Sequence, residues 1–516
     1  MRRARFLAGL AGGGRGQELR DEIQASLGAR AVLDRRTRVL AGRSGRVLLG
    51  GEPFRLLKLT AVAQAALQSG EERLVERLVV RLVAAGLAHP TPPPVELEPG
   101  RVKIVVPARD DSEPLAALLR SLGVDGRAGA ECPSEGSPGA GFSAEVVVVD
   151  DGSLEPVRGA AVRHAVPLGP AAARNAARPL LGEGAEFVFF LDADCEAAPS
   201  VAAALAGHFG DPAVGAVAPR VRPRALATPA RLASYEASGG SPLDLGPDPG
   251  VVGAHRRISY VPSAAILCRR EALDAVGWFD EGLRVGEDVD LLRRLEAGGF
   301  VVRYDPRAEV THRCRPDVFA FARQRFSYGR STAALHRRHP GTVASFEAGT
   351  WAALGDAALA GAMVLAGVGC RPGGAVCIAA LAVGLGVPAR ALGRHLGEAG
   401  VGWRDALPTA ASVVATGQGR SLAGVHTALR RAWWPVLLAA AAVSPRRARR
   451  CLLLMLAFVA VPRRPAASRS IALSILDDGA HCCGLWAGCA AEGSLGALLP
   501  RLYRRGDWSP SSTSSS

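Results

Sequence analysis

Short apolar runs alternate with helical patterns between residues 100 and 345. Four runs rich in Val, Ile or Phe are bounded by turns, which is typical of strands covered on both faces: residues 103–106, 146–149, 187–191 and 214–218. Four segments between or after them carry apolar residues at helical spacing: residues 115–122, 170–181, 201–209 and 289–297. This alternation predicts an α/β domain over residues 100–345 with a mostly parallel sheet.

A smaller pattern precedes this domain. Residues 38–40 and 46–49 flank a Gly-rich turn and predict a hairpin, and residues 59–67 and 71–85 have helical periodicity. Gly86 ends the second helix, and a proline-rich linker follows it. A hairpin with short helices predicts a winged-helix-like module over residues 1–95. It contains no convergent catalytic set, so we expect it to bind a partner.

The chain becomes strongly apolar after residue 350. The apolar runs are residues 351–370, 374–389, 433–443 and 451–461. Most of them are shorter than the roughly 20 residues that cross a bilayer, so buried helices of a soluble domain are an alternative. We favour membrane helices over residues 350–500, because the runs are bracketed by arginines and flanked by tryptophans. Residues 501–516 are expected to be a disordered tail.

Composition adds three constraints. The 516 residues are 48% hydrophobic with a mean hydropathy of +0.15, which excludes a mostly disordered chain, and their formal net charge is +14. The positive charge suits an anionic partner, such as a nucleic acid, an anionic lipid or a phosphorylated substrate. Because the basic residues are spread over apolar flanks and loops, nucleic acid ranks low. The ten cysteines form no C-x-x-C pair, which favours a reduced, cytoplasm-facing protein.

Acidic pairs follow two of the predicted strands. Asp150 and Asp151 come directly after one strand, and Asp192 and Asp194 follow the next. Open sheets of this kind bind ligands at the carboxyl ends of their strands. The first pair can accept hydrogen bonds from a ribose or a base, although an Asp-Gly turn is an equal alternative. The second pair can hold a divalent cation that also binds a diphosphate, and a capped turn is its alternative.

Three further groups are candidates for chemistry. Glu287 and Asp288 open a predicted helix, where one of them can act as a general base or both can simply cap the helix. Arg174 and Asn175 lie in a helix that begins after Gly169 and can bind phosphate or base. A basic stretch can clamp a diphosphate or form a solvated face: His312, Arg323, Arg325, Tyr328 and Arg330.

The order of these motifs closely resembles the family-2 glycosyltransferases with the GT-A fold. The sequence carries P-A-R-D (107–110), V-V-D-D-G-S (148–153), G-P-A-A-A-R-N (169–175), L-D-A-D (191–194) and G-E-D-V-D-L (286–291). The stretches at 259–270 and 277–281, the module at the start and the apolar part at the end look like the glycosyltransferases of mycofactocin biosynthesis.

That resemblance implies a function and a site. It implies an inverting enzyme that uses Mg²⁺ or Mn²⁺ to transfer glucose from UDP-glucose, building a β-1,4-linked chain on a premycofactocin-type acceptor. The implied metal residues are Asp194, Asp192 and His312, and the implied catalytic residues are Asp288, as general base, and Glu287. The residues implied to bind the nucleotide sugar are Pro107, Asp110, Asp150, Asp151, Arg174, Asn175, Asp192, Arg323 and Arg330. The first module looks like peptide-recognition modules of ribosomal-peptide pathways and implies peptide or protein partners.

The resemblance has one departure and leaves two rivals. Processive synthases of this family carry Q-x-x-R-W, whereas this chain has only Arg323-Gln324-Arg325-Phe326. A polymer-threading synthase is therefore not expected. The rivals are a membrane enzyme that acts on a lipid-linked or cell-wall acceptor, and a membrane-anchored scaffold without turnover. We expect the enzyme at the cell membrane with its α/β domain in the cytoplasm.

Overall fold

The computed structural model describes residues 13–43, 45–98, 100–124, 145–226, 228–367, 371–446, 449–450, 452–453 and 470–503. The chain divides into two compact units. Unit 1 consists of residues 1–90, 344–461 and 493–516, and unit 2 consists of residues 91–343 and 462–492. Almost all of the predicted run at 451–461 and of the predicted tail at 501–516 lies outside the described residues; only residues 501–503 of the tail are described, as a short strand.

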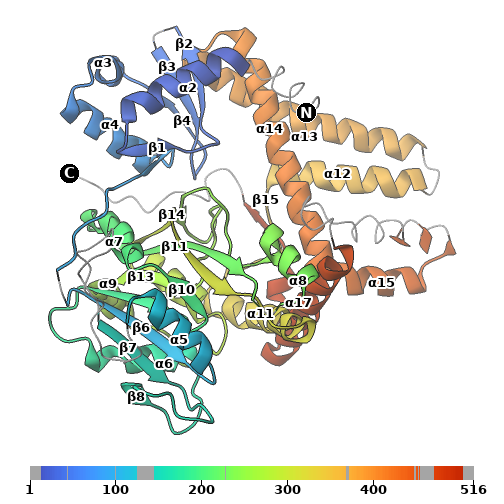
Figure 1. Ribbon diagram of the computed structural model, residues 1–516. Helices are drawn as coiled ribbons and strands as arrows, with labels where there is room; N and C mark the ends of the chain where they lie inside the picture. Colours follow the sequence, from blue (N-terminus) through green and yellow to red (C-terminus); the bar gives the residue numbers. More distant parts are fainter. Residues whose placement is uncertain are drawn as a thin grey trace. The chain divides into compact units, whose positions relative to one another are not determined.

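Unit 2 is built around a nine-stranded sheet (Figure 1). Its main order is β10-β14-β11-β13-β9-β6-β7-β8, and β12 pairs with β14. Its strands are β6 (Val102–Ala108), β7 (Glu145–Asp150), β8 (Val162–Arg163), β9 (Phe187–Leu191), β10 (Cys195–Ala197), β11 (Val214–Arg224), β12 (Gly250–Val252), β13 (Ala265–Arg269) and β14 (Val301–Arg313). β10, β12 and β13 run against the other six. The predicted α/β class with a mostly parallel sheet is confirmed.

Helices cover both faces of this sheet, because alternate residues of its strands point to opposite sides. Ile104 and Val106 of β6 pack with α5 (Ser112–Ser121) and α7 (Ser200–Ala206). Val105 faces the other side, together with α6 (Pro170–Ala176), α9 (Arg270–Val276) and α10 (Glu287–Ala297). Short helical turns lie at Arg178–Leu180, Gly207–Gly210 and Glu236–Gly240, the last of which follows α8 (Ala230–Tyr235). Burial on both faces explains why the strands read as continuous apolar runs.

Two long helices complete unit 2. α11 (Val318–Arg338) packs along α17 (Ile471–Glu492), and glycines line their contact. A Cβ added at Gly329, Gly484 or Gly488 would overlap the backbone of the facing helix. The membrane-associated region predicted for residues 350–500 stays a prediction, although one of its helices, α17, groups with the α/β unit. Buried Asp477 in α17 also distinguishes this helix from an all-apolar span.

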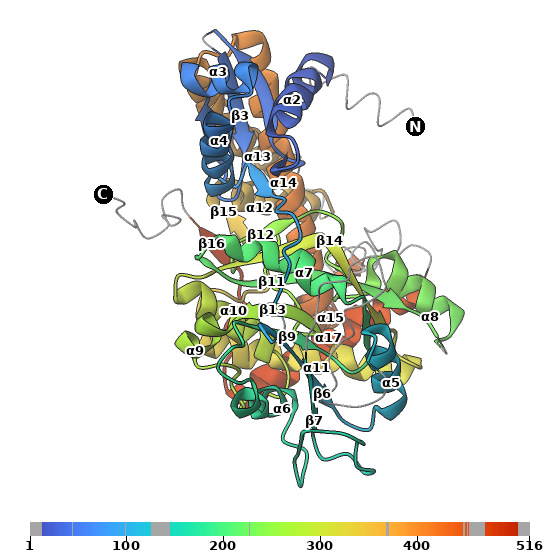
Figure 2. The ribbon, with the colours of Figure 1, turned by 60° about the vertical axis from the view of Figure 1, so that its left-hand side comes forward.

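The first part of unit 1 contains the predicted hairpin and helices. β2 (Arg38–Gly42) pairs with β3 (Gly45–Gly50), and α3 (Ala61–Ser69) and α4 (Glu72–Ala84) follow. The sequence did not predict three strands and the first helix: α2 (Gly13–Leu27), β1 (Ala31–Leu33), β4 (Arg55–Lys58) and β5 (Ala88–Pro90). Figure 2 shows the helices and strands of this module in a second orientation. The partner of this module stays a prediction.

Apolar helices make up most of the rest of unit 1. They are α12 (Thr350–Gly367), α13 (Arg371–Glu398), α14 (Trp403–Ala428), with a helical turn at Leu429–Trp433, and α15 (Trp434–Val443). β15 (Glu347–Gly349) pairs with β16 (Arg501–Tyr503), which follows a short turn at Gly496–Leu498. Within the described ranges, one helix is long and apolar enough to cross a membrane, over Pro372–Glu398 with a mean hydropathy of 1.9.

The aromatic core beneath β9 generates a stability prediction. Phe190 is fully buried and makes edge contacts with the rings of Trp278 and Phe279. Replacing a buried phenylalanine by alanine removes apolar burial and leaves a cavity, so we expect Phe190→Ala to cost about 3–5 kcal/mol. Phe319→Ala is the matched control, because Phe319 is 87% exposed and its loss should cost less than about 0.5 kcal/mol. Chemical denaturation measures both, and equal costs would contradict this description of the core.

Candidate active site

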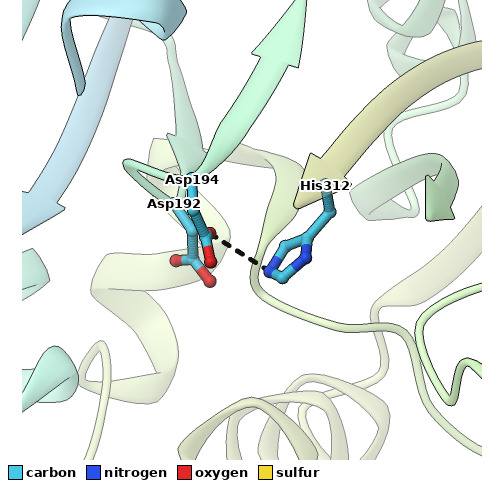
Figure 3. A group of neighbouring side chains, drawn as sticks. All are labelled: Asp192, Asp194 and His312. Atoms are coloured by element: carbon cyan, nitrogen blue, oxygen red, sulfur yellow. Dashed lines mark ion pairs between the residues drawn. The ribbon is translucent and has the colours of Figure 1, made fainter. Parts of the chain in front are cut away.

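The carboxyl end of β9 carries the two central acids of the site. Asp192 and Asp194 follow this strand, and the next strand, β10, pairs antiparallel with β14 so that Cys195 lies opposite His312. This register brings the His312 ring to Asp194, with Nε2 and Oδ1 3.1 Å apart (Figure 3). The metal-binding atoms of Asp192, Asp194 and His312 all lie within 4.8 Å of one another. Two carboxylates and an imidazole suit a divalent cation such as Mn²⁺, so the predicted trio fits a metal.

Arg315 contacts Asp194 and was not predicted from the sequence. Its Nη2 lies 3.0 Å from Asp194 Oδ2, and it follows β14 three residues after His312. Burial alone would raise the pKa of Asp194, but His312 and Arg315 together lower it well below its usual range. The position of Arg315, three residues after His312, is the only sequence feature that marks it. The sequence instead predicts that arginines further along the chain contact the diphosphate.

Arg174 connects these acids to a second acidic motif. Its guanidinium donates to Asp192 Oδ1 at 2.6 Å and to Glu287 Oε1 at 2.9 Å. The side chain is only 2% exposed, so both carboxylates compensate a fully buried charge. The predicted contact between Arg174 and the nucleotide stays a prediction; in the structure the guanidinium joins the two carboxylates and positions them.

Asp288 has the environment of a general base. It lies in the first turn of α10, after Gly286 with a φ of 88°, a left-handed conformation that favours glycine. Its Oδ2 accepts a long hydrogen bond of 3.4 Å from the Ser263 amide. Burial and the adjacent Glu287 raise the pKa of Asp288 to about 7. A carboxyl group with this pKa can take up a proton near neutral pH.

The predicted nucleotide-binding acids organise loops. Asp150 is fully buried and accepts from the amides of Ser153 and Val157 and from Arg163. Asp151 accepts from His164 and from the amides of Leu168 and Gly169. Both carboxylates therefore bond the loops that follow them, as the turn alternative predicts. Their contact with a nucleotide stays a prediction.

Asp110 lies at the carboxyl end of β6, beyond Pro107, which is part of that strand. It has a φ of 56°, and its carboxylate accepts from the Leu154 amide at 2.8 Å. The bond joins the loop after β6 to the loop after β7. The neighbouring Asp111 was not predicted, and burial and the facing Asp194 raise its pKa to about 6. The loops after β6 and β7 therefore meet at one edge of the sheet.

Three other predicted residues have no hydrogen bond or ion pair with Asp192 or Asp194 in the part of the chain that the structure describes. Asn175 uses its amide to bond the backbone of Phe279 in both directions and to donate to Glu281, which gives it a structural task. Arg323 and Arg330 are exposed on α11. Within the described residues, the arginine contacts of Asp192 and Asp194 come from Arg174 and Arg315 instead. Contact of Arg323 and Arg330 with a diphosphate stays a prediction, and Arg315 is a further candidate for this contact because its guanidinium lies at Asp194.

The chain matches a known family model over more than half of its length. The model described as glycosyl transferase family group 2 matches residues 187–468, which begin at β9. The chain is also 34% identical over 499 residues to the pre-mycofactocin glycosyltransferase of Mycobacterium tuberculosis, in both strain CDC 1551 / Oshkosh and strain ATCC 25618 / H37Rv. Each alignment covers 91% of this chain and 97% of the relative.

Solved structures resemble the chain more distantly. A mannosyltransferase from Pyrobaculum calidifontis in complex with GDP-Man and Mn²⁺ is 18% identical with a TM-score of 0.39, covering 83% of this chain and 98% of that one. TarS 1-349 from S. aureus in complex with UDP-GlcNAc is 17% identical with a TM-score of 0.31, covering 45% and 66%.

The family model and the near-full-length relatives confirm the predicted resemblance and, with the mixed sheet, the predicted GT-A class of fold. The chain belongs to glycosyl transferase family group 2, together with the pre-mycofactocin glycosyltransferases.

Proposed function

We propose that this enzyme transfers glucose from UDP-glucose to pre-mycofactocin and extends the product into a β-1,4-linked chain. The acceptor is the one named for the relatives at 34% identity. UDP-glucose, the linkage and inversion come from the resemblance of the motifs. The observation that carries the proposal is the meeting of Asp192, Asp194 and His312 with Glu287 and Asp288 through one buried arginine.

Transfer requires a single displacement at the anomeric carbon. The acceptor oxygen forms a bond to this carbon while the bond from the carbon to the diphosphate oxygen breaks, and UDP leaves with the electron pair. Asp288 accepts the proton of the acceptor hydroxyl, and attack opposite to UDP inverts the configuration. Glu287 is held by Arg174, so it fixes the start of α10 and the direction of Asp288.

The leaving diphosphate carries negative charge that must be stabilised. Asp194, Asp192 and His312 would hold Mg²⁺ or Mn²⁺, which supplies positive charge at the diphosphate oxygens. Arg315 would add a second positive charge, because its guanidinium already lies at Asp194. Both groups act where charge develops in the transition state, which is where electrostatic stabilisation accelerates a reaction.

A membrane location is part of the proposal. α13 supports it, since only 11% of its apolar window is buried inside the protein. We place unit 2 on the cytoplasmic side, as the basic residues before α12 indicate. The same helix favours a second candidate function, transfer to a lipid-linked or cell-wall acceptor, whereas the module of residues 13–90 favours a peptide-derived acceptor.

The base assignment predicts the effect of Asp288→Asn. This variant cannot accept a proton, so we expect transfer to fall by roughly 10²–10⁴-fold while the Kd for UDP changes less than about twofold. Mass spectrometry of hexosylated pre-mycofactocin formed from UDP-glucose measures the transfer. Glu296→Gln, on the same helix, is the matched control and should retain activity. If Asp288→Asn kept most of its turnover, Asp288 would not be the base. If the wild-type protein modified a lipid-linked acceptor and not pre-mycofactocin, the second candidate function would be favoured.

The pKa of Asp288 also predicts a pH dependence. Because its pKa is raised to about 7, the carboxyl group becomes protonated and inactive as the pH falls through this value. We expect kcat/KM to fall about tenfold per pH unit below pH 7 and to level off above it. Initial rates between pH 5.5 and 8.5 measure the profile. A profile that is flat down to pH 5.5 would contradict the assignment.

The metal assignment predicts the behaviour of His312→Ala. Loss of one of three ligands should weaken Mn²⁺ binding, so the gain in UDP affinity that Mn²⁺ gives the wild type should shrink by at least about tenfold. Titration calorimetry with UDP, with and without Mn²⁺, measures this gain. Glu183→Gln, which changes an exposed carboxylate of unit 2, should leave it unchanged. An undiminished gain in His312→Ala would remove His312 from the metal site.

A further inference from the structure

A row of buried side chains with alternating charge connects the site to α17. Asp477 of α17 lies 3.1 Å from Nε of Arg325 in α11, and Arg325 Nη2 lies 3.6 Å from Glu236 Oε1. All three side chains are at most 6% exposed. Tyr235 at the end of α8 donates a hydrogen bond of 2.9 Å to the other oxygen of Asp477.

Glu236 continues this row to Arg315. Glu236, His312 and Arg315 line the same small cavity. Burial lowers the pKa of Arg315, but Asp194, Tyr328 and Glu236 raise it, so Glu236 acts on this guanidinium electrostatically. Arg315 in turn pairs with Asp194. The order of charges from α17 to the metal trio is therefore Asp477, Arg325, Glu236, Arg315 and Asp194.

Stability alone is a poor reason for such a row. Buried ion pairs often stabilise a protein no more than apolar side chains of the same size, because desolvation of the charges offsets their attraction. The glycine contact between α11 and α17 already fixes the two helices against each other. Another task for these charges is indicated by the far end of the row, which lies at Arg315, the side chain that the proposed function assigns to the diphosphate.

We propose that Asp477 is a positioning residue that acts through Arg325 and Glu236 to hold Arg315 toward the diphosphate of the donor. This proposal rests on the proposed function, since it requires a nucleoside diphosphate donor. Asp477 neutralises Arg325, which leaves Glu236 available to Arg315. Without the charge of Asp477, Glu236 is drawn to Arg325, and Arg315 loses one of its two carboxylate neighbours.

Binding of UDP and of uridine to the full-length protein tests this role. In Asp477→Asn we expect the Kd for UDP to rise about tenfold, as for other residues that orient a ligand-binding group, while the Kd for uridine stays unchanged. Asp477→Glu should restore most of the UDP affinity. Asp478→Asn changes the next carboxylate of α17, and Tyr235→Phe removes a hydrogen bond from Asp477 without changing its charge, so both should keep the wild-type Kd for UDP.

Each other outcome overturns the proposal. If Asp477→Asn weakens UDP and uridine equally, or if Tyr235→Phe weakens UDP as much, the role of Asp477 is structural. If UDP binding does not change, Asp477 does not act on Arg315. If the wild-type protein bound UDP no more tightly than uridine, both this inference and the proposed donor would be wrong. The results on the Asp477 variants test this inference alone, so the two failures can be distinguished.

Discussion

One buried guanidinium holds the site together. Arg174 is compensated by Asp192 from the end of β9 and by Glu287 from the start of α10, which are 95 positions apart in the sequence. A buried arginine is energetically costly unless its charge is paired. If either acidic motif moved away, the buried charge of Arg174 would be left partly uncompensated. This constraint keeps the proposed metal residues, Asp192, Asp194 and His312, close to Asp288. The rest of the sheet brings the end of β9 and the start of α10 within reach of Arg174.

The sequence predicted four of the nine strands, β6, β7, β9 and β11, because these strands appear as uninterrupted apolar runs, but it did not predict the other five. It also singled out Asp192 and Asp194, since residues at the carboxyl ends of parallel strands share one edge of the sheet. His312 was singled out only as part of a basic stretch and through the family resemblance. The pairing of β10 with β14 then determines that His312 faces Asp194, and pairing over such a separation is not visible in a periodic pattern.

The choice between arginines could not be made from the sequence. Arg323, Arg325 and Arg330 all lie on α11, but only the packing of α17 decides which side chain is buried. Likewise, residues 471–492 fall within the region predicted to be membrane-associated, although glycines and Asp477 pack this segment against α11 in the α/β unit. For Asp150 and Asp151, the same sequence pattern fits a turn and a ligand-binding site. Only the structure shows that both carboxylates accept hydrogen bonds from the surrounding amides, as in a turn.

The account depends on a cation and a diphosphate meeting at the end of β9. Crystals of the protein grown with UDP and Mn²⁺ would give an anomalous difference map at the manganese absorption edge. The account predicts one peak between Asp194 and His312, in contact with both phosphates of UDP. A peak bound elsewhere on unit 2, with UDP remote from these residues, would contradict it.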